Sequence, residues 1–214
     1  MKIENNSRIV FIGDSITDCG RDKPIGQNQG LGNGYVNCVN SLIEANDYEA
    51  QFEIINMGTG GNRIVDLEER WSTDVTELNP QWVSIMIGIN DVWRQFDCPR
   101  SKNQVSIQKF ESVYRNLLEN TLNYTKGIIL MTPFYIEKNP DDPMRKMMDQ
   151  YSRVVAKLAK EYKTLFVDTQ RVFGRFLMSN PTQMLCWDRV HPNLTGHFII
   201  AKGFLNTIDF KWNY

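Results

Sequence analysis

Short apolar runs recur along the chain and predict five β-strands. Each run is only a few residues long and is followed within two positions by glycine or a polar residue, which is the pattern of a buried strand. The predicted strands are Val10–Ile12, Phe52–Asn56, Trp82–Ile87, Gly127–Met131 and Thr164–Val167.

Between the strands, apolar residues repeat every three or four positions, which predicts helices with one buried face. The expected helices span residues 35–45, 64–78, 107–122, 168–178 and 194–208, with a further long helix from the 140–143 turn to residue 162. Loops are expected at 19–34, which is rich in glycine, and at 92–103, which carries Trp93, Phe96 and Pro99. The alternation of strands and helices predicts one α/β domain over residues 1–214, with helices on both faces of a parallel sheet.

The first strand runs into Gly13-Asp14-Ser15, which leaves a serine hydroxyl at its carboxyl end. In parallel α/β sheets, ligands bind and chemistry takes place at this edge. Serine and aspartate are also ordinary turn and helix N-cap residues. Ser15 becomes a candidate nucleophile because other parts of the chain supply the groups that such a serine needs.

A serine hydroxyl needs a base to take its proton, and the chain has only two histidines. His191 follows Asp188 by three positions, so that the carboxylate can reach the imidazole Nδ1 and leave Nε2 facing the serine. His197 lies inside the last predicted helix with no carboxylate near it in sequence. An isolated Asp-x-x-His is more often a surface or capping feature. The catalytic interpretation of this pair therefore depends on the other motifs of the chain.

Acyl transfer also needs hydrogen-bond donors for the negative oxygen that develops on the substrate. Gly61, in the glycine-rich turn after the second strand, offers a backbone N–H that no side chain blocks. Asn90, after the third strand, offers a side-chain amide. Taken singly, the glycines only make a tight turn and Asn90-Asp91 only caps a helix. Their occurrence after successive strands, as for Ser15, predicts that they meet at one edge of the sheet.

The composition limits the classes of molecule that the protein is expected to bind. Lysine plus arginine number 24 against 25 aspartate plus glutamate, so no basic field favours nucleic acid or an anionic membrane surface. No apolar run approaches the roughly 20 residues of a membrane span, and Met1–Ser7 lacks the apolar core of a signal peptide. Cys19, Cys38, Cys98 and Cys186 lack metal-ligand spacing. We expect a cytoplasmic protein without cofactor or metal that acts on a neutral small molecule.

Four motifs resemble the four blocks of the GDSL or SGNH hydrolase superfamily, in the same order along nearly the whole chain. They are Gly13–Ile16, Asn56–Asn62, Gly88–Asp91 and Asp188–Pro192. The resemblance implies a three-layer α/β/α, flavodoxin-like SGNH hydrolase fold with a five-stranded parallel sheet, and the absence of a Gly-x-Ser-x-Gly elbow agrees with it.

By the same resemblance, Ser15 is the nucleophile, His191 the base and Asp188 its orienting acid. The Ser15 N–H, the Gly61 N–H and the Asn90 amide then form the oxyanion hole. Gly60 departs from the pattern, since many relatives have serine before the oxyanion glycine. This change is expected to loosen the turn while sparing the donor.

Further segments are similar to the bacterial intracellular acetyl-xylooligosaccharide esterases, at residues 18–21, 87–95, 131–137 and 142–145. That likeness implies a serine esterase that removes acetyl groups from short xylan fragments. Candidate substrate-binding residues are Asp14 beside the serine and the aromatic residues Trp93, Tyr135 and Trp187, whose rings can stack on sugars or serve as simple packing.

Alternatives remain at the level of the sequence. Asp14, Asp91, Asp188 and His191 could instead hold the metal of a phosphoesterase. The chain could also be a sugar-binding module without activity, or a family member that acts on lipids or on other small acyl groups. The aromatic tail Phe210–Tyr214 is expected to dock on its own chain or to form the contact of a homo-oligomer.

Overall fold

The computed structural model describes residues 1–23, 28–46, 51–97 and 103–212. Its centre is a five-stranded sheet in the order β2-β1-β3-β4-β5, and every neighbouring pair is parallel. All five strands overlap the predicted apolar runs, so the predicted sheet is confirmed. The strands are β1 (Arg8–Gly13), β2 (Glu53–Gly58), β3 (Trp82–Met86), β4 (Gly127–Met131) and β5 (Leu165–Val167).

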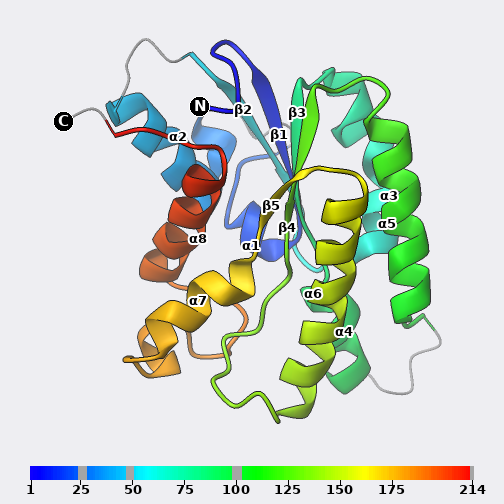
Figure 1. Ribbon diagram of the computed structural model, residues 1–214, viewed down its shortest axis with the longest axis vertical. Coiled ribbons are helices and arrows are strands. Elements are labelled where there is room, and N and C mark those ends of the chain that lie inside the picture. The colour runs from blue at the N-terminus through cyan, green and yellow to red at the C-terminus, as the bar shows by residue number, and fades with distance from the viewer. Residues whose placement is uncertain (24–27, 47–50, 98–102, 213–214) are drawn as a thin grey trace.

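Helices cover both faces of this sheet and complete the three layers (Figure 1). One layer holds α2 (Tyr35–Asn46), α7 (Thr169–Leu177) and α8 (Leu194–Thr207). The other holds α3 (Ile64–Asp74), α5 (Ile107–Thr121) and α6 (Pro143–Glu161). Because helices pack on both faces, strand residues are buried whichever way they point, and all of 9–12 in β1 are inaccessible to solvent.

The register of the edge strand β2 with its neighbours β1 and β3 explains where the motifs meet. Gly13, the last residue of β1, pairs with Gly58 of β2 and with Met86 of β3. The chain therefore leaves these three strands at the same level. The short helix α1 (Ser15–Asp18), the turn that follows β2 and the helix α4 (Ile89–Asp97) all begin at this carboxyl edge, toward the bottom of Figure 1.

Two predicted boundaries were wrong. The helix expected over 64–78 ends at Asp74, and a separate 3-10 turn, η2 (Thr76–Leu78), follows it. Asn79 then adopts a left-handed conformation with φ of 48° just before Pro80. Further 3-10 turns are η1 (Asn28–Leu31) and η3 (Thr182–Met184).

The loop expected over 92–103 was also wrong in its first half, because α4 runs to Asp97. Ile89 and Val92 are buried three positions apart, which is the helical spacing that the aromatic residues had obscured. The part of that segment at 98–102 lies outside the described residues. None of the helices in the described part of the chain is long and apolar enough to cross a membrane.

Candidate active site

Ser15 lies at the first position of α1, directly beyond β1. Asp14 caps this helix, since its Oδ1 accepts from the Ile16 N–H at 3.0 Å. Gly13 has to be a glycine, because a Cβ there would lie 2.4 Å from both Met86 O and Thr17 Oγ1. The close packing of the chain at Gly13 lets α1 start at once and leaves the Ser15 side chain only partly buried.

His191 and Asp188 complete a hydrogen-bonded series with Ser15. The Ser15 Oγ lies 2.9 Å from His191 Nε2, and His191 Nδ1 lies 2.6 Å from Asp188 Oδ2. A carboxylate only accepts, so the imidazole carries its proton on Nδ1 and the serine hydroxyl donates to Nε2. Ser15 is 173 positions from Asp188 in the sequence. The structure nevertheless brings these residues together, as the sequence predicted.

The surroundings of Asp188 favour the ionised form of its carboxyl group. Partial burial raises its pKa, but hydrogen bonds from the His191 ring and from the backbone N–H groups of His191 and Val190 outweigh this effect. The net result is a pKa below the ordinary value of an aspartate. An ionised Asp188 can therefore stabilise a positive charge on the imidazole during proton transfer.

The loop that carries His191 is fastened on two sides. The Ile136 N–H, beyond β4, donates to Arg189 O at 2.8 Å, and the Arg189 guanidinium forms an ion pair with Glu137 at 2.7 Å. On the other side, the Asn193 side chain caps the start of α8. The imidazole is thereby held between the segment after β4 and the helix α8.

His197 is placed as the sequence suggested, away from the role of a base. Burial lowers its pKa to about 4, and its Nδ1 accepts from the Tyr35 N–H at 3.1 Å. The ring proton is then on Nε2, which lies 3.4 Å from Cys19 Sγ. His197 is a neutral structural histidine.

The candidate oxyanion donors converge on the same edge. Gly61 has a φ of 81°, a conformation that favours glycine, and a Cβ there would meet no atom within 4 Å. Its N–H has no hydrogen-bond partner among the residues that the structure describes. Asn90, at the start of α4, donates one amide hydrogen to Asn62 O at 3.0 Å and retains a second. The Ser15 N–H is in the first turn of α1 and has no helical acceptor.

Asp14 does not suit the predicted role in substrate binding, and this part of the prediction is corrected. Its side chain is only 1% exposed and is engaged in capping α1. Burial raises its pKa to about 7, against the opposing effects of the Ile16 N–H and of the charges on His191 and Arg70. The neighbouring carboxyl of Asp91 is likewise buried, with a pKa of about 7.

The same contacts bear on the metal-site alternative. Asp14 binds the Ile16 N–H, and both oxygens of Asp91 accept from the Ile64 N–H at 3.1 and 3.2 Å. His191 Nδ1 is engaged by Asp188. Within the described ranges, no group of three or more His, Cys, Asp or Glu side chains could hold a metal ion.

The aromatic candidates line two pockets beside the site. Trp93 and Tyr135 share a pocket of about 350 Å³ with Arg189, and the Trp93 ring centroid lies 6.0 Å from that of His191. Trp187, which is 92% exposed, lines a second pocket of about 460 Å³, also bordered by Arg189. A third pocket, of about 550 Å³ between α6 and α7, contains none of the residues of the Ser15 series.

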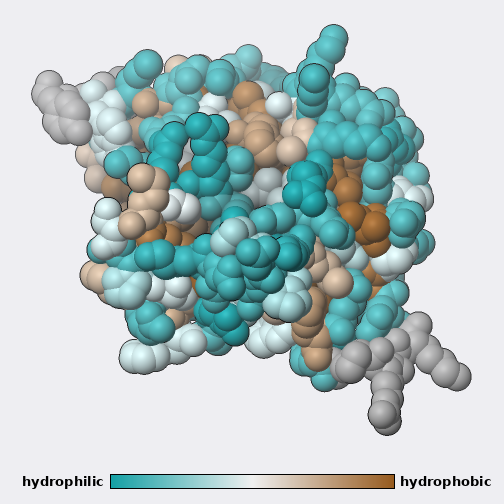
Figure 2. All heavy atoms as spheres, turned by 60° about the horizontal axis from the view of Figure 1, so that its bottom comes forward, coloured by the Kyte–Doolittle hydropathy of each residue, from teal (hydrophilic) through white to brown (hydrophobic). Residues whose placement is uncertain are grey.

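The surface around the site is mostly polar. The end of the molecule at the bottom of Figure 1 comes forward in Figure 2, where hydrophilic residues dominate and apolar ones form separate patches. Such a surface suits a polar substrate better than a long acyl chain.

The structure also adds residues that the sequence did not single out. Arg70 on α3 bonds to Met57 O near the carboxyl end of β2 and to the Asn62 side chain in the turn that follows. Arg70 also pairs with Asp74 four positions later, the spacing of an ordinary ion pair on a helix surface. No motif spacing distinguishes it, because its acceptors come from the turn and from two strands.

This fold with a serine–histidine–aspartate series at the carboxyl edge of its sheet defines the class of serine acyl hydrolases. The model of the GDSL-like Lipase/Acylhydrolase family matches residues 11–199, and the chain belongs to this family. It is therefore a hydrolase of carboxylic esters, and the expected family is confirmed.

Its relatives are known from sequence and from crystal structures. The chain is 50% identical to an acetylxylan esterase of Geobacillus stearothermophilus, over 99% of this chain and 98% of the relative. The crystal structure of an acetylxylan esterase from that organism superposes with a TM-score of 0.98, at 50% identity and with 100% and 99% of the two chains covered. An alpha/beta hydrolase enzyme from the metagenome of Lake Arreo, Spain, matches with a TM-score of 0.96 at 42% identity, covering 98% of each chain.

The Geobacillus enzyme has also been solved as catalytic mutants. In these, a serine, an aspartate or a histidine is replaced by alanine. The substituted residue types are those of the Ser15 series.

Proposed function

We propose that this protein is a serine esterase that removes O-acetyl groups from xylooligosaccharides through an acetyl-enzyme on Ser15. The observation that carries the proposal is the series from Ser15 Oγ to His191 Nε2, at 2.9 Å, and from His191 Nδ1 to Asp188, at 2.6 Å. This geometry lets one proton leave the hydroxyl as the oxygen attacks.

In the first half of the reaction, Ser15 Oγ attacks the acetyl carbonyl carbon while its proton passes to His191 Nε2. The carbonyl oxygen becomes negative and accepts hydrogen bonds from the Ser15 N–H, the Gly61 N–H and the Asn90 amide. The bond between the acetyl carbon and the sugar oxygen then breaks. That oxygen takes the proton from Nε2, and the deacetylated sugar leaves.

In the second half, a water molecule attacks the acetyl-Ser15 carbonyl and gives its proton to His191 Nε2. The bond to Ser15 Oγ breaks, Oγ recovers the proton, and acetic acid leaves and ionises to acetate in water. Asp188 keeps the imidazole in the same orientation in both halves. The enzyme is thus regenerated without any change in its own protonation.

The substrate class is supported by the relatives and by the surface. The Geobacillus relative is an acetylxylan esterase, and it aligns over the whole length of this chain. Arg189 borders both pockets and offers a guanidinium to a sugar chain, with the rings of Trp93 and Trp187 as aromatic faces. The Tyr135 ring is only 4% exposed and has the Arg189 guanidinium over it at 5.0 Å. We infer that the acetyl group enters the Ser15 site while the xylose units lie along these pockets.

The test is release of acetate from acetylated xylooligosaccharides by the purified Ser15→Ala variant. We expect activity to fall by about a thousandfold or more with the fold intact, since loss of a nucleophile removes the covalent route. Ser41→Ala is the matched control, because Ser41 is an exposed serine on α2.

A second measurement uses a serine-directed phosphonate followed by peptide mass spectrometry. Labelling is expected on Ser15 in the parent protein and to be lost in Ser15→Ala. Full acetate release by Ser15→Ala would overturn the proposal. Loss of activity on treatment with a chelator would favour the metal-dependent alternative, and saturable sugar binding without turnover would favour the binding module.

The setting of the enzyme is also proposed. The free thiols of Cys19, Cys38 and Cys186 suit the reducing cytoplasm, where short imported sugar fragments would be processed. The deacetylated sugar and acetate would be its products there. Cys98 lies outside the described residues.

A homo-oligomer is proposed from apolar side chains left on the surface. Phe210 is buried on its own chain, and Lys211 O accepts from Asn46 of α2, whereas Trp212 stays 43% exposed. The end of the tail, 213–214, lies outside the described residues. Light scattering on a chain truncated after Asp209 tests the idea, since an unchanged mass would remove the tail as the contact between copies.

A further inference from the structure

The turn between β2 and α3 carries the Gly61 donor but has little of its own to fix its shape. Gly58, Gly60 and Gly61 have no side chains to pack, and the space beside Gly61 is open. Among the described residues, one backbone hydrogen bond closes the turn on itself, from the Asn62 N–H to Thr59 O at 3.3 Å, and one ties it to β1, from the Thr59 N–H to Gly13 O at 3.1 Å. An N–H that must meet a developing negative oxygen has to be held more firmly than this.

Arg70 supplies bonds from the α3 side. Its Nε donates to the Asn62 Oδ1 at 2.6 Å, at the far end of the turn, and Nη1 donates to Met57 O at 2.7 Å, in β2 just before the turn begins. Nη2 donates to Gly13 O at 3.0 Å, two residues before Ser15. One planar guanidinium therefore ties the turn to the end of the strand that delivers the nucleophile.

Asn62 extends this connection to the other donor. Its side chain receives Arg70, and its backbone oxygen accepts from the Asn90 amide at 3.0 Å. A displacement of Asn62 would therefore reorient the Asn90 amide. It would also shift the N–H of Gly61, the preceding residue. Arg70 thus bonds to Asn62, which adjoins Gly61 and accepts from Asn90, and to Gly13, two residues before Ser15.

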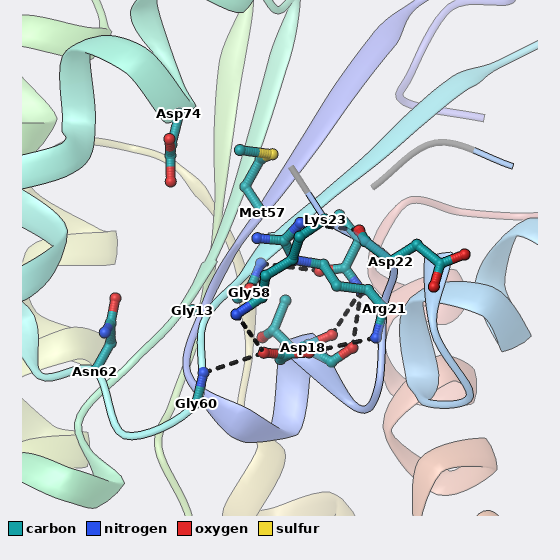
Figure 3. A network of polar contacts seen from close by, with 12 residues as sticks. Gly13, Asp18, Arg21, Asp22, Lys23, Met57, Gly58, Gly60, Asn62 and Asp74 are labelled. Atoms are coloured by element: carbon teal, nitrogen blue, oxygen red, sulfur yellow. Dashed lines mark hydrogen bonds and ion pairs between the residues drawn. The ribbon is translucent and has the colours of Figure 1, made fainter. Parts of the chain in front are cut away.

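Asp18 holds the opposite side of the turn. Its Oδ2 accepts from the Gly60 N–H at 3.1 Å, as the dashed line between them in Figure 3 shows. Its Oδ1 accepts from the Arg21 N–H at 3.3 Å, and Arg21 Nε donates to Gly58 O at 2.6 Å. In Figure 3, Asn62 lies across Gly60 from Asp18, so the turn is held from both sides.

We propose that Arg70 and Asp18 are positioning residues that fix the oxyanion turn from its two sides. The inference rests on the proposed function, because it assumes that Gly61 and Asn90 bind the oxyanion. It also explains how a chain with Gly60 in place of the usual serine keeps a defined turn, since a carboxylate from α1 binds the Gly60 backbone instead.

The positioning role of Arg70 depends on the shape of its side chain as well as on its charge. Arg70 is only 17% exposed, with its Nη1 also bonded to Asp74 at 2.5 Å. A guanidinium presents its donors in a rigid fork, whereas lysine offers a single ammonium on a flexible stem. Arg70→Lys should therefore keep the positive charge and lose the simultaneous bonds to Gly13, Met57 and Asn62.

The test compares Arg70→Lys and Arg70→Met with the parent on p-nitrophenyl acetate and on the matching thionoester, whose sulfur accepts hydrogen bonds poorly. For the oxygen ester we expect kcat to fall about tenfold to a hundredfold in both variants, with little change in KM. The thionoester should lose much less. The ratio of the two kcat/KM values should thus fall, which damage to the fold alone would not cause.

Arg115→Lys is the matched control. Arg115 also forks between neighbouring helices, bonding to Glu111 and to Glu161 at the end of α6, but it is far along the chain from the turn and none of its partners belongs to the site. It should keep the parent ratio. Circular dichroism and melting curves on each variant report whether the fold is retained.

Asp18 gives an independent arm in case Arg70 variants fail to fold. Asp18→Ala removes the acceptor of the Gly60 N–H and should lower the ester to thionoester ratio. Asp18→Asn keeps an oxygen in that position and should restore most of the ratio, although its pairing with Lys23 is lost.

The outcomes separate the two proposals. A parent-like ratio in Arg70→Lys and in Asp18→Ala, with Ser15→Ala inactive, would overturn the positioning role and leave the esterase proposal standing. Equal losses on both esters would also overturn it, because the damage would then not be specific to the oxyanion. Full activity of Ser15→Ala would overturn both proposals together.

Discussion

Asp188 binds His191 twice, at the ring and at the backbone. Asp188 Oδ2 accepts from His191 Nδ1 at 2.6 Å, and Oδ1 accepts from the His191 N–H at 2.8 Å. The Val190 N–H also donates to Oδ1 at 2.9 Å. One carboxylate therefore fixes both the position of the loop and the tautomer of the ring.

This double contact predicts different results for two substitutions at Asp188. In Asp188→Asn, the amide oxygen can still accept from the backbone, so the amide nitrogen is turned toward Nδ1 and donates to it. That arrangement forces the proton onto Nε2 and blocks proton transfer from Ser15. We expect kcat to fall about a thousandfold to ten-thousandfold.

Asp188→Ala leaves the tautomer free and should be the faster of the two variants, although its loop is less well held. Steady-state kinetics with p-nitrophenyl acetate make the comparison. An asparagine variant with activity near that of the parent would contradict the role given to Asp188.

The backbone at Gly61 predicts a second contrast, with Gly60 as its control. Gly61→Ala places a side chain at a φ of 81°, which costs about 1 to 2 kcal/mol of stability. Because a Cβ there would contact nothing within 4 Å, the effect comes from the backbone, and rotation of the N–H should lower kcat about tenfold or more.

Gly60→Ala should be mild, since its Cβ would meet Ser15 Cβ at an ordinary 3.8 Å. Urea denaturation and kcat for both variants test the pair. Equal effects at the two positions would show that the turn does not depend on the conformation of Gly61.

The buried carboxyl of Asp14 predicts a pH dependence of stability. Burial raises its pKa from 3.8 to about 7, so the folded state binds more protons than the unfolded state between these values. Stability contributed by this group is therefore highest at low pH and is lost as the pH rises toward 7. Asp14→Asn keeps an acceptor for the Ile16 N–H and removes the titration.

The measurement is the free energy of unfolding of both proteins in urea between pH 5 and 8. The variant should gain on the parent as the pH rises, by at least about 1 kcal/mol, since each unit of pKa separation corresponds to about 1.4 kcal/mol. A constant difference across this range would mean that Asp14 does not titrate with a raised pKa.

The exposed indole of Trp187 predicts a change confined to sugar substrates. At 92% exposure it contributes little packing, so Trp187→Ala should melt at the parent temperature. Loss of an aromatic contact worth about 0.5 to 1.5 kcal/mol should raise KM for acetylated xylooligosaccharides about twofold to tenfold. Kinetics on p-nitrophenyl acetate, which has no sugar units to contact the indole, should stay the same. An unchanged KM for the oligosaccharide would remove Trp187 from the substrate site.

Much of the architecture was open to prediction because it depends on local patterns. Apolar runs such as Gly127–Met131 gave the strands, since a strand buried on both faces must be apolar throughout. The segment around Trp93 was misjudged because aromatic residues and Pro99 suggested a loop, while the buried pair Ile89 and Val92 already had helical spacing.

At the site, the sequence was enough to name the residues of the motifs. It did not reveal how buried they are or which other side chains contact them. Asp14 was expected to meet substrate because it adjoins Ser15, yet its cap on α1 turns the side chain inward. Arg70 was missed because its acceptors Asn62, Met57 and Gly13, which lie 8, 13 and 57 positions away, follow no helical spacing and are brought to it by the packing of α3 on the sheet.

By itself the sequence determined the order of strands and helices and singled out the candidate reactive side chains, because both follow from residue type and spacing along one segment. Only the tertiary structure decided that Ser15 Oγ lies 2.9 Å from His191 Nε2, that Asp14 is buried, and that Arg70 and Asp18 reach the glycine turn from opposite sides. Distances and burial of this kind depend on strand register and helix packing, which are set by contacts between segments far apart in the chain.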